Sequence, residues 1–155
     1  MYKLYQEQFL PVDLETAWSF FTSPFNLKKI TPPYMGFEIV SKDTKSEIFE
    51  GQLIDYKVKP VLSIPMFWRT EIKNVIYRRE FTDTQLRGPY KQWIHRHRFV
   101  KKDHGVLMID EIDYEVPFSI FGKLAHALFI RRQLKGIFEY RKQVLNNTFR
   151  NGNID

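Results

Sequence analysis

Apolar and polar residues alternate along most of the chain, with the period of two that a half-buried strand shows. The alternation starts over residues 2–9, is interrupted at Pro11, and returns from residue 36 up to Pro117. In this second stretch the pattern predicts strands at residues 36–42, 51–59, 66–78, 80–86, 91–102 and 105–116. Together with the first strand they make a sheet of seven strands.

Two short helices are expected between the first strand and the others. Asp13 is a favourable N-cap because its carboxylate can accept from free N–H groups of the first helical turn. After Asp13, apolar residues follow the helical spacing i, i+3, i+4 and i+7, at Leu14, Ala17, Trp18 and Phe21. A second short helix is expected at residues 25–30, before Thr31-Pro32-Pro33 ends it.

The pattern changes to a period of 3.6 residues near the end of the chain. One broad apolar face runs from about Phe118 to Asn147 and contains Ala127, Ile130, Leu134, Ile137, Phe138, Val144 and Leu145. A helix of this length is about 45 Å long and has to lie across a whole sheet to bury that face. The order of elements predicts a single α+β domain over residues 1–150, with residues 151–155 as a disordered tail.

Composition adds an unusual aromatic content. Phe, Tyr and Trp make up 16% of the 155 residues, which predicts either a broad core or a lined cavity. The chain has no cysteine, and this excludes disulfides, thiolate metal ligands and thiol nucleophiles. No charged-then-apolar leader opens the chain and no apolar run reaches the ~18 residues of a spanning helix, so a cytoplasmic location is expected.

The basic residues do not form a nucleic-acid-binding run. The formal net charge is +6, but Lys and Arg occur as scattered pairs such as Lys28-Lys29 and Arg131-Arg132. No nucleic-acid partner is therefore expected, while weak peripheral contact with anionic membranes stays open. The sequence indicates no oligomeric state.

A hairpin near the middle of the chain places histidines among aromatic residues. If Asp103 and His104 form a two-residue loop, Lys102 pairs with Gly105 and the register of both strands follows. The predicted pairs on one face are Phe99 with Met108, His97 with Asp110, His95 with Ile112, and Trp93 with Tyr114. The other face then brings arginines of one strand against acidic residues of the next, which supports the same register.

Several local motifs accompany this order of elements. They are Trp18-Ser-Phe-Phe, Asn26-Leu-Lys-Lys-Ile-Thr-Pro-Pro, Gly51-Gln-Leu-Ile-Asp-Tyr56, Trp68-Arg-Thr-Glu-Ile72, Phe81-Thr-Asp-Thr-Gln85, Gly88-Pro-Tyr-Lys-Gln-Trp93-Ile-His-Arg-His97-Arg-Phe99, Asp110-Glu-Ile-Asp-Tyr114-Glu-Val-Pro117-Phe, Arg131-Arg-Gln-Leu and Ile137-Phe-Glu-Tyr-Arg141. The chain resembles the START-like SRPBCC superfamily, and within it the bacterial cyclase/dehydrase-like, ligand-binding proteins. This resemblance implies the helix-grip fold, in which a curved seven-stranded antiparallel sheet wraps around a long C-terminal helix. Members range from polyketide aromatases to lipid carriers, so the fold does not decide the function.

The pair formed by His97 and Asp110 has three interpretations. It is a buried polar pair that satisfies itself, or part of a binding site in which His95 and His97 face a ligand, or a catalytic pair. In the catalytic interpretation Asp110 orients His97 as a general base, and His95 or Tyr114 donates to the developing enolate. A zinc site with Asp110 as third ligand lacks an evident fourth ligand, so neither a metal nor another cofactor is expected.

The remaining pocket candidates follow from the phase of each element. The predicted ligand-binding residues are Tyr56, Trp68, Trp93, His95, His97, Asp110, Tyr114, Leu134, Phe138 and Arg141. Arg141 lies inside the apolar face of the helix, so it either snorkels past the end of the sheet or holds an anionic ligand at the cavity mouth. The phase of Asp83 and Gln85 stays open because Gly88-Pro89 obscures the register of their hairpin.

These residues predict a function as a container. We expect an apolar cavity of roughly 300 Å³ or more between sheet and long helix, open near residues 60–65. The favoured function is binding or transport of a hydrophobic small molecule, such as a lipid, a polyketide or an aromatic compound. The alternative is a polyketide cyclase/dehydratase-like enzyme that uses a histidine–aspartate acid/base pair.

Overall fold

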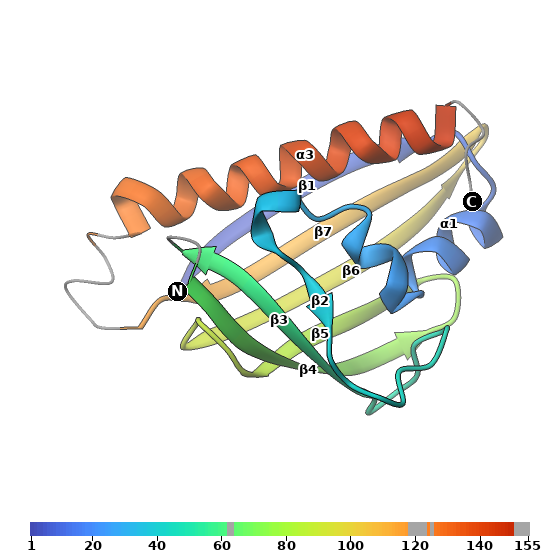
Figure 1. Ribbon diagram of the computed structural model, residues 1–155. Coiled ribbons are helices and arrows are strands. Elements are labelled where there is room, and N and C mark those ends of the chain that lie inside the picture. Colours follow the sequence, from blue (N-terminus) through green and yellow to red (C-terminus); the bar gives the residue numbers. More distant parts are fainter. Residues whose placement is uncertain (62–63, 118–123, 125, 151–155) are drawn as a thin grey trace.

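Seven antiparallel strands form one sheet in the order β1-β7-β6-β5-β4-β3-β2 (Figure 1). The computed structural model describes residues 1–61, 64–117, 124 and 126–150. The strands are β1 (Tyr2–Leu10), β2 (Glu38–Ile39), β3 (Leu53–Val61), β4 (Ile64–Ile76), β5 (Glu80–Arg87), β6 (Gln92–Lys102) and β7 (Gly105–Glu115). Along β6 and β7, buried and more exposed residues largely alternate, as expected for a sheet that is covered on one face.

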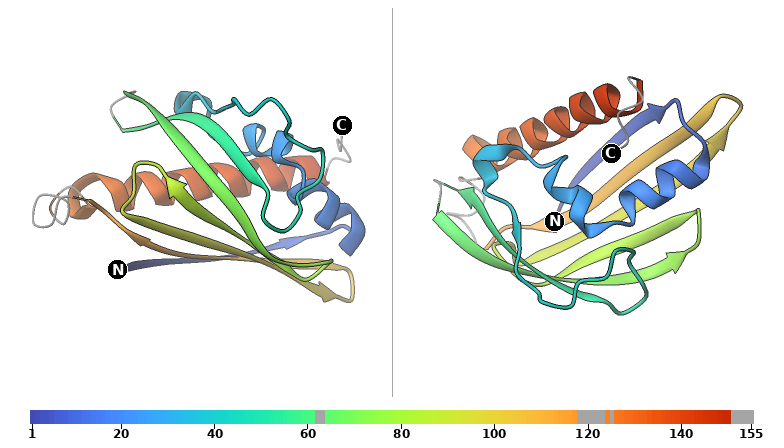
Figure 2. Two further views of the ribbon diagram at one scale, coloured as in Figure 1. Left: turned by 90° about the horizontal axis from the view of Figure 1, so that it is seen from below. Right: turned by 45° about the vertical axis from the view of Figure 1, so that its right-hand side comes forward.

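Helical segments cover the concave face of the sheet. They are α1 (Leu14–Phe21), the 3₁₀ turns η1 (Pro24–Lys28) and η2 (Pro33–Met35), the π-helical turn η3 (His126–Ile130) and α3 (Arg131–Arg150). Figure 2 shows the sheet curving around α3, which crosses it at an angle. This α+β helix-grip arrangement is the predicted one. None of the helices among the described residues is both long enough and apolar enough to cross a membrane.

Local chemistry explains where the first helix begins. Asp13 has an extended backbone, and its side chain accepts a hydrogen bond of 2.9 Å from the Thr16 N–H, as expected for an N-cap. Trp18 on α1 packs edge-on against Phe81 and Phe99 of the sheet. The helix thereby closes one end of the core.

The hairpin of β6 and β7, whose loop is Asp103 and His104, has the expected register. Lys102 pairs with Gly105, and the ladder continues through His97 with Asp110 and Trp93 with Tyr114. All four predicted pairs are confirmed. A two-residue loop of this kind sets the register of the strands that it joins.

Two predicted elements differ from the structure. The strand expected over residues 36–42 is reduced to β2, because Pro33–Met35 forms a 3₁₀ turn that ends at Gly36 with a left-handed φ of 52°. The long helix is described from η3 at His126, and α3 extends to Arg150, beyond the predicted end at Asn147. The predicted start at Phe118 and the predicted disordered tail at 151–155 both lie outside the described residues.

Candidate functional site

A pocket of about 200 Å³ lies between the sheet, the η1–η2 segment and α3. It is smaller than the roughly 300 Å³ expected from the sequence. Its walls include most of the sequence-predicted residues, namely Tyr56, Trp68, Trp93, His95, His97, Leu134, Phe138 and Arg141. Asp110 and Tyr114 are buried but are not among the residues that line the pocket.

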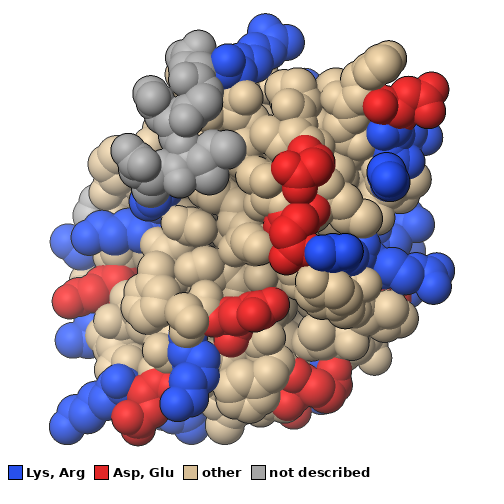
Figure 3. All heavy atoms as spheres, turned by 90° about the vertical axis from the view of Figure 1, so that its right-hand side faces the viewer, with Lys and Arg blue, Asp and Glu red and all other residues tan. Residues whose placement is uncertain are grey.

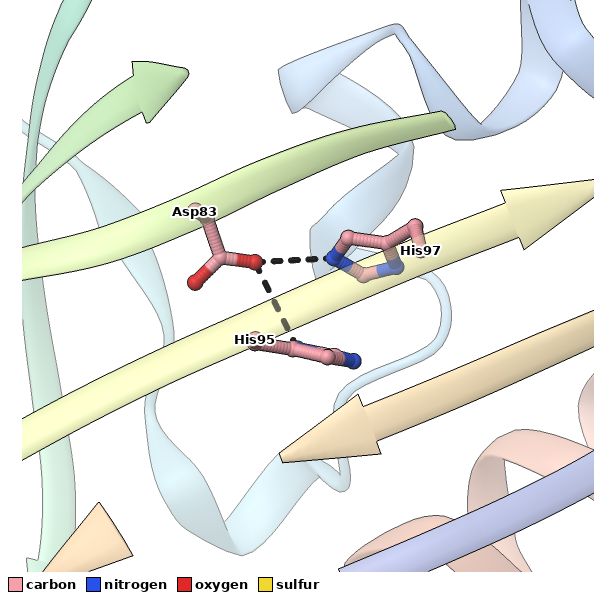
Figure 4. A group of neighbouring side chains, drawn as sticks. All are labelled: Asp83, His95 and His97. Carbon is pink, nitrogen blue, oxygen red and sulfur yellow. Dashed lines mark hydrogen bonds and ion pairs between the residues drawn. The ribbon is translucent and has the colours of Figure 1, made fainter. Parts of the chain in front are cut away.

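Three side chains of this wall, Asp83, His95 and His97, point toward one another from neighbouring strands (Figure 4). β5 supplies Asp83, which lies directly opposite His95 of β6 in the ladder. Asp83 Oδ2 is hydrogen-bonded to His97 Nε2 at 2.8 Å and lies 3.4 Å from His95 Nδ1. A single carboxylate oxygen therefore faces one nitrogen of each ring.

Asp110 on β7 lies behind the two histidines. Its Oδ1 is hydrogen-bonded to His95 Nε2 at 2.8 Å, and it lies 3.0 Å from His97 Nδ1 and 3.4 Å from a terminal nitrogen of Arg141. The predicted position of Asp110 opposite His97 is correct, but its aligned hydrogen bond goes to His95, since His97 Nδ1 has no aligned partner among the described residues. Each histidine thus faces Asp83 with one ring nitrogen and Asp110 with the other.

Burial and charge act in opposite directions on these groups. Burial is the largest influence on both carboxyls and raises their pKa, but Arg141 and the histidines outweigh it. They hold the pKa of Asp110 well below its usual value and lower that of Asp83. Burial, together with the charge of His97, lowers the pKa of His95. Burial also opposes protonation of His97, but its contacts with Asp110 and Asp83 prevail and raise its pKa.

Arg141 is buried inside the fold. Only 7% of the residue is exposed, and its guanidinium lies over the rings of Phe21 and Phe138 at 5.2 and 5.7 Å. Of the two alternatives for Arg141, snorkelling past the end of the sheet is therefore excluded. A buried guanidinium needs a counter-charge, which Asp110 supplies. Its role toward an anionic ligand stays a prediction.

Aromatic rings form the wall next to this cluster. Trp68, Tyr90 and Trp93 are in mutual contact, with centroid distances of 5.7 Å from Trp68 to Tyr90, 5.4 Å from Trp68 to Trp93, and 4.8 Å from Tyr90 to Trp93. Tyr114 supports Tyr90 and Trp93 from the side. Burial raises the pKa of Tyr90, so its hydroxyl remains protonated.

The positions of Asp83 and Tyr90 depend on the connection between β5 and β6, whose register the sequence left open. The Gln85 side chain donates to the Tyr90 carbonyl at 2.7 Å and accepts from the Tyr90 N–H at 3.3 Å. This pair of hydrogen bonds ties the loop to β5, and the β5–β6 register places Asp83 opposite His95 in the wall of the pocket. Asp83 and Tyr90 are functional candidates that the sequence did not identify, since the phase of Asp83 stayed open.

A contact between α3 and β3 crosses one edge of the pocket. The Gln133 side chain donates to the carbonyl of Pro60, and both residues line the pocket. Pro60 lies where the β3–β4 register shifts between Val58 and Val61, a position that proline tolerates. The opening was expected near residues 60–65, of which 62–63 lie outside the described residues.

In the part of the chain that the structure describes, the fold and the pocket define a helix-grip protein with an aromatic interior and one buried charged cluster. The chain belongs to the family described as polyketide cyclase / dehydrase and lipid transport, whose model matches residues 10–138. The predicted resemblance to START-like SRPBCC proteins is confirmed. A comparison with curated proteins finds no match.

Solved structures support the same fold. The chain is similar to TTHA0849 from Thermus thermophilus, with 16% identity and a TM-score of 0.68 over 97% of this chain and 98% of that one. It is similar to CV1439 from Chromobacterium violaceum, with 12% identity and a TM-score of 0.70 over 95% and 96% of the two chains. A START superfamily protein from Mycobacterium smegmatis has 11% identity and a TM-score of 0.68 over 96% and 97%. At these identities the likeness concerns the fold alone.

Proposed function

We propose that this protein binds or carries a compact hydrophobic small molecule in the pocket between the sheet and α3. The observation that supports this function is an apolar, aromatic pocket with a single buried charged cluster in its wall. Pockets of this kind use apolar walls for affinity and a few polar groups for orientation. An aromatic or polyketide-type compound with one hydrogen-bonding group suits both the apolar walls and the polar cluster.

The size of the pocket favours a compact ligand over a long-chain lipid. Its volume of about 200 Å³ is below the range of roughly 300–1,000 Å³ typical of drug-sized ligands. Trp68, Tyr90 and Trp93 offer flat surfaces for a ring system. The hydrogen-bonding group of the ligand would face Asp83, His95 or His97.

The geometry favours a binding function over the cyclase/dehydratase alternative. A general base needs a free ring nitrogen that faces the substrate. His97 presents its Nε2 to Asp83 and its Nδ1 to Asp110, so neither nitrogen is directed at the pocket alone. Asp110, which would orient the base, contacts His95 more directly.

The face of the molecule shown in Figure 3 carries no continuous basic surface. On the face shown in Figure 3, basic side chains lie in small groups toward the edges, with acidic side chains between them. This pattern favours a small-molecule partner over a nucleic acid, which needs a continuous basic surface. A cytoplasmic location and weak contact with anionic membranes stay predictions.

Binding can be followed with the protein's own tryptophans and an aromatic probe. Two of its three tryptophans, Trp68 and Trp93, line the pocket. We expect 1-anilinonaphthalene-8-sulfonate to bind with saturable fluorescence, and native mass spectrometry of freshly purified protein to show an apolar compound that the probe displaces. A protein that binds neither a co-purified compound nor the probe would rule out the proposal.

Neighbouring positions on α3 provide a matched pair of variants. Leu134→Trp places a larger side chain in the pocket, whereas Lys135→Trp makes the same addition on the exposed side of the helix. We expect the first variant to weaken probe binding at least tenfold and the second to leave it unchanged, with both remaining folded by circular dichroism. Equal affinity in the two variants would place the binding site elsewhere.

A further inference from the structure

We propose that Asp83, His95 and His97 form a binding site for a divalent first-row transition metal ion, with Zn²⁺ as the expected occupant. Two imidazoles and one carboxylate are ligands that such ions accept together. The sequence pointed to Asp110 as the third ligand, but the structure brings Asp83 to the side of the rings that faces the pocket.

The three ligand atoms have suitable spacing. Atoms held about 2.0–2.2 Å from one Zn²⁺ lie roughly 3–3.5 Å from one another. Asp83 Oδ2 lies 2.8 Å from His97 Nε2 and 3.4 Å from His95 Nδ1, and candidate ligand atoms of all three residues lie within 4.8 Å of one another. Small rotations about the side-chain bonds suffice to place one ion among them.

The other ring nitrogens have the partner that metal-bound histidines require. A ligating histidine usually donates its remaining N–H to a carboxylate or carbonyl, which fixes the orientation of the ring. Here one oxygen, Asp110 Oδ1, lies 2.8 Å from His95 Nε2 and 3.0 Å from His97 Nδ1. Asp110 thus orients the ring of His95 through a hydrogen bond and lies close to that of His97, and Arg141 at 3.4 Å holds Asp110 in turn.

The surroundings leave at least one coordination position directed at the pocket. Asp83, His95 and His97 all line the pocket, whereas Asp110 does not. Three protein ligands with an open position are typical of zinc sites that bind water or a ligand atom. Since Arg141 adds a positive charge beside two carboxylates, an anionic oxygen of a bound molecule suits this position.

Neighbouring strands make the site rigid. His95 and His97 are two residues apart on β6, and Asp83 is cross-strand to His95 on β5. Sites built on strands hold their ligands more accurately than sites built on loops. This inference goes beyond the proposed function and does not depend on it, because it rests on the cluster and not on the apolar walls.

Metal titration of untagged protein tests the site. The protein is dialysed against chelator, then titrated with Co²⁺ for its visible d–d absorption and with Zn²⁺ by calorimetry. We expect one ion per chain, displacement of Co²⁺ by Zn²⁺, and a melting temperature that rises with Zn²⁺ concentration. Failure of Zn²⁺ to bind or to stabilise the chain overturns the proposal, whatever the result with the apolar probe.

Four variants locate the ion. Asp83→Asn and His95→Gln are expected to weaken Zn²⁺ binding more than Asp110→Asn does, and Asp110→Asn is expected to weaken it by about 10–100-fold. His104→Gln removes an exposed histidine at the hairpin tip and is expected to change nothing. Unchanged affinity in Asp83→Asn, or a loss confined to His104→Gln, overturns the assignment.

Nuclear magnetic resonance of the wild type avoids the risk that a variant fails to fold. With ¹⁵N-labelled histidine, Zn²⁺ is expected to shift His97 Nε2 and His95 Nδ1 toward metal-bound values, while His97 Nδ1 and His95 Nε2 keep their protons. The two rings thus bind through different nitrogens, which random surface binding does not reproduce. A spectrum in which these resonances stay unchanged at saturating Zn²⁺ overturns the proposal.

Discussion

Replacing Asp110 by asparagine tests the charge balance of the buried cluster. The substitution keeps the shape and leaves an amide oxygen that can still accept from His95 Nε2, so the packing and one hydrogen bond survive. What is lost is the negative charge whose Oδ1 lies 3.4 Å from Arg141 and 3.0 Å from His97 Nδ1. Arg141 then stays buried at 7% exposure without its nearest counter-charge.

The size of the effect follows from that loss. Removing one partner of a buried ion pair costs roughly 3–5 kcal/mol. We expect the lower end, about 3 kcal/mol, because the hydrogen bond to His95 is kept and Asp83 remains near. With a urea m-value of about 2 kcal/mol/M this lowers the unfolding midpoint by about 1.5 M, and it lowers the melting temperature by about 6–12 °C.

Urea denaturation followed by circular dichroism, with chelator present, measures this loss. Asp113→Asn is the matched control, because it makes the same change on the same strand where the side chain is 39% exposed and pairs with Lys3, itself 80% exposed, at 3.4 Å. Such a surface pair contributes about 0–1 kcal/mol. If the two variants unfold at the same urea concentration, the buried cluster does not stabilise the fold through its charge balance.

Three further predictions concern the scaffold. Asp13→Ala is expected to lose about 1 kcal/mol of stability by removing the cap of α1. Hydrogen bonds with Thr16 lower the pKa of Asp13 from 3.8. The extra stability of the wild type over Asp13→Ala is therefore present above pH 3.8 and disappears as the pH falls through the lowered pKa. A stability difference that persists in acid contradicts this. Gly136→Ala, in α3 with nothing within 4 Å of the added Cβ, is expected to raise stability by roughly 0.8–1 kcal/mol. Gly105→Ala places its Cβ well inside contact distance of the Leu10 carbonyl oxygen and is expected to lower the stability of the fold by about 1–3 kcal/mol. Equal urea midpoints for the two glycine variants would contradict these two expectations.

The register of β6 and β7 could be predicted from the sequence because it depends on local chemistry. A two-residue loop and alternating residues on both strands allow a single pairing, so His97 opposite Asp110 followed directly. The long helix and the α+β order of elements were likewise visible in the change of hydrophobic period, and the helix-grip fold followed from the resemblance to START-like proteins. These signals lie within one or two adjacent elements.

The composition of the site depends on contacts between distant elements and was only partly predictable. Asp83 faces the pocket from its place opposite His95 in the β5–β6 ladder, a register that the loop with Gly88-Pro89 hid in the sequence. The sequence placed Arg141 inside the apolar face of the helix but did not reveal the partner of its side chain. Only the fold brings Arg141 within 3.4 Å of Asp110. The volume of the pocket depends on how all the side chains pack, which periodicity does not reveal.

The contact between Gln133 and Pro60 bears on the kinetics of exchange. It joins α3 to β3 at the edge of the pocket, so a ligand that leaves by this edge requires the helix and the strand to separate first. Entry by the same edge requires the same opening motion, so compounds of very different affinity would share similar slow association rates. Differences in affinity between compounds then appear in their residence times, and loss of the Gln133 contact would speed both entry and release more than it changes affinity.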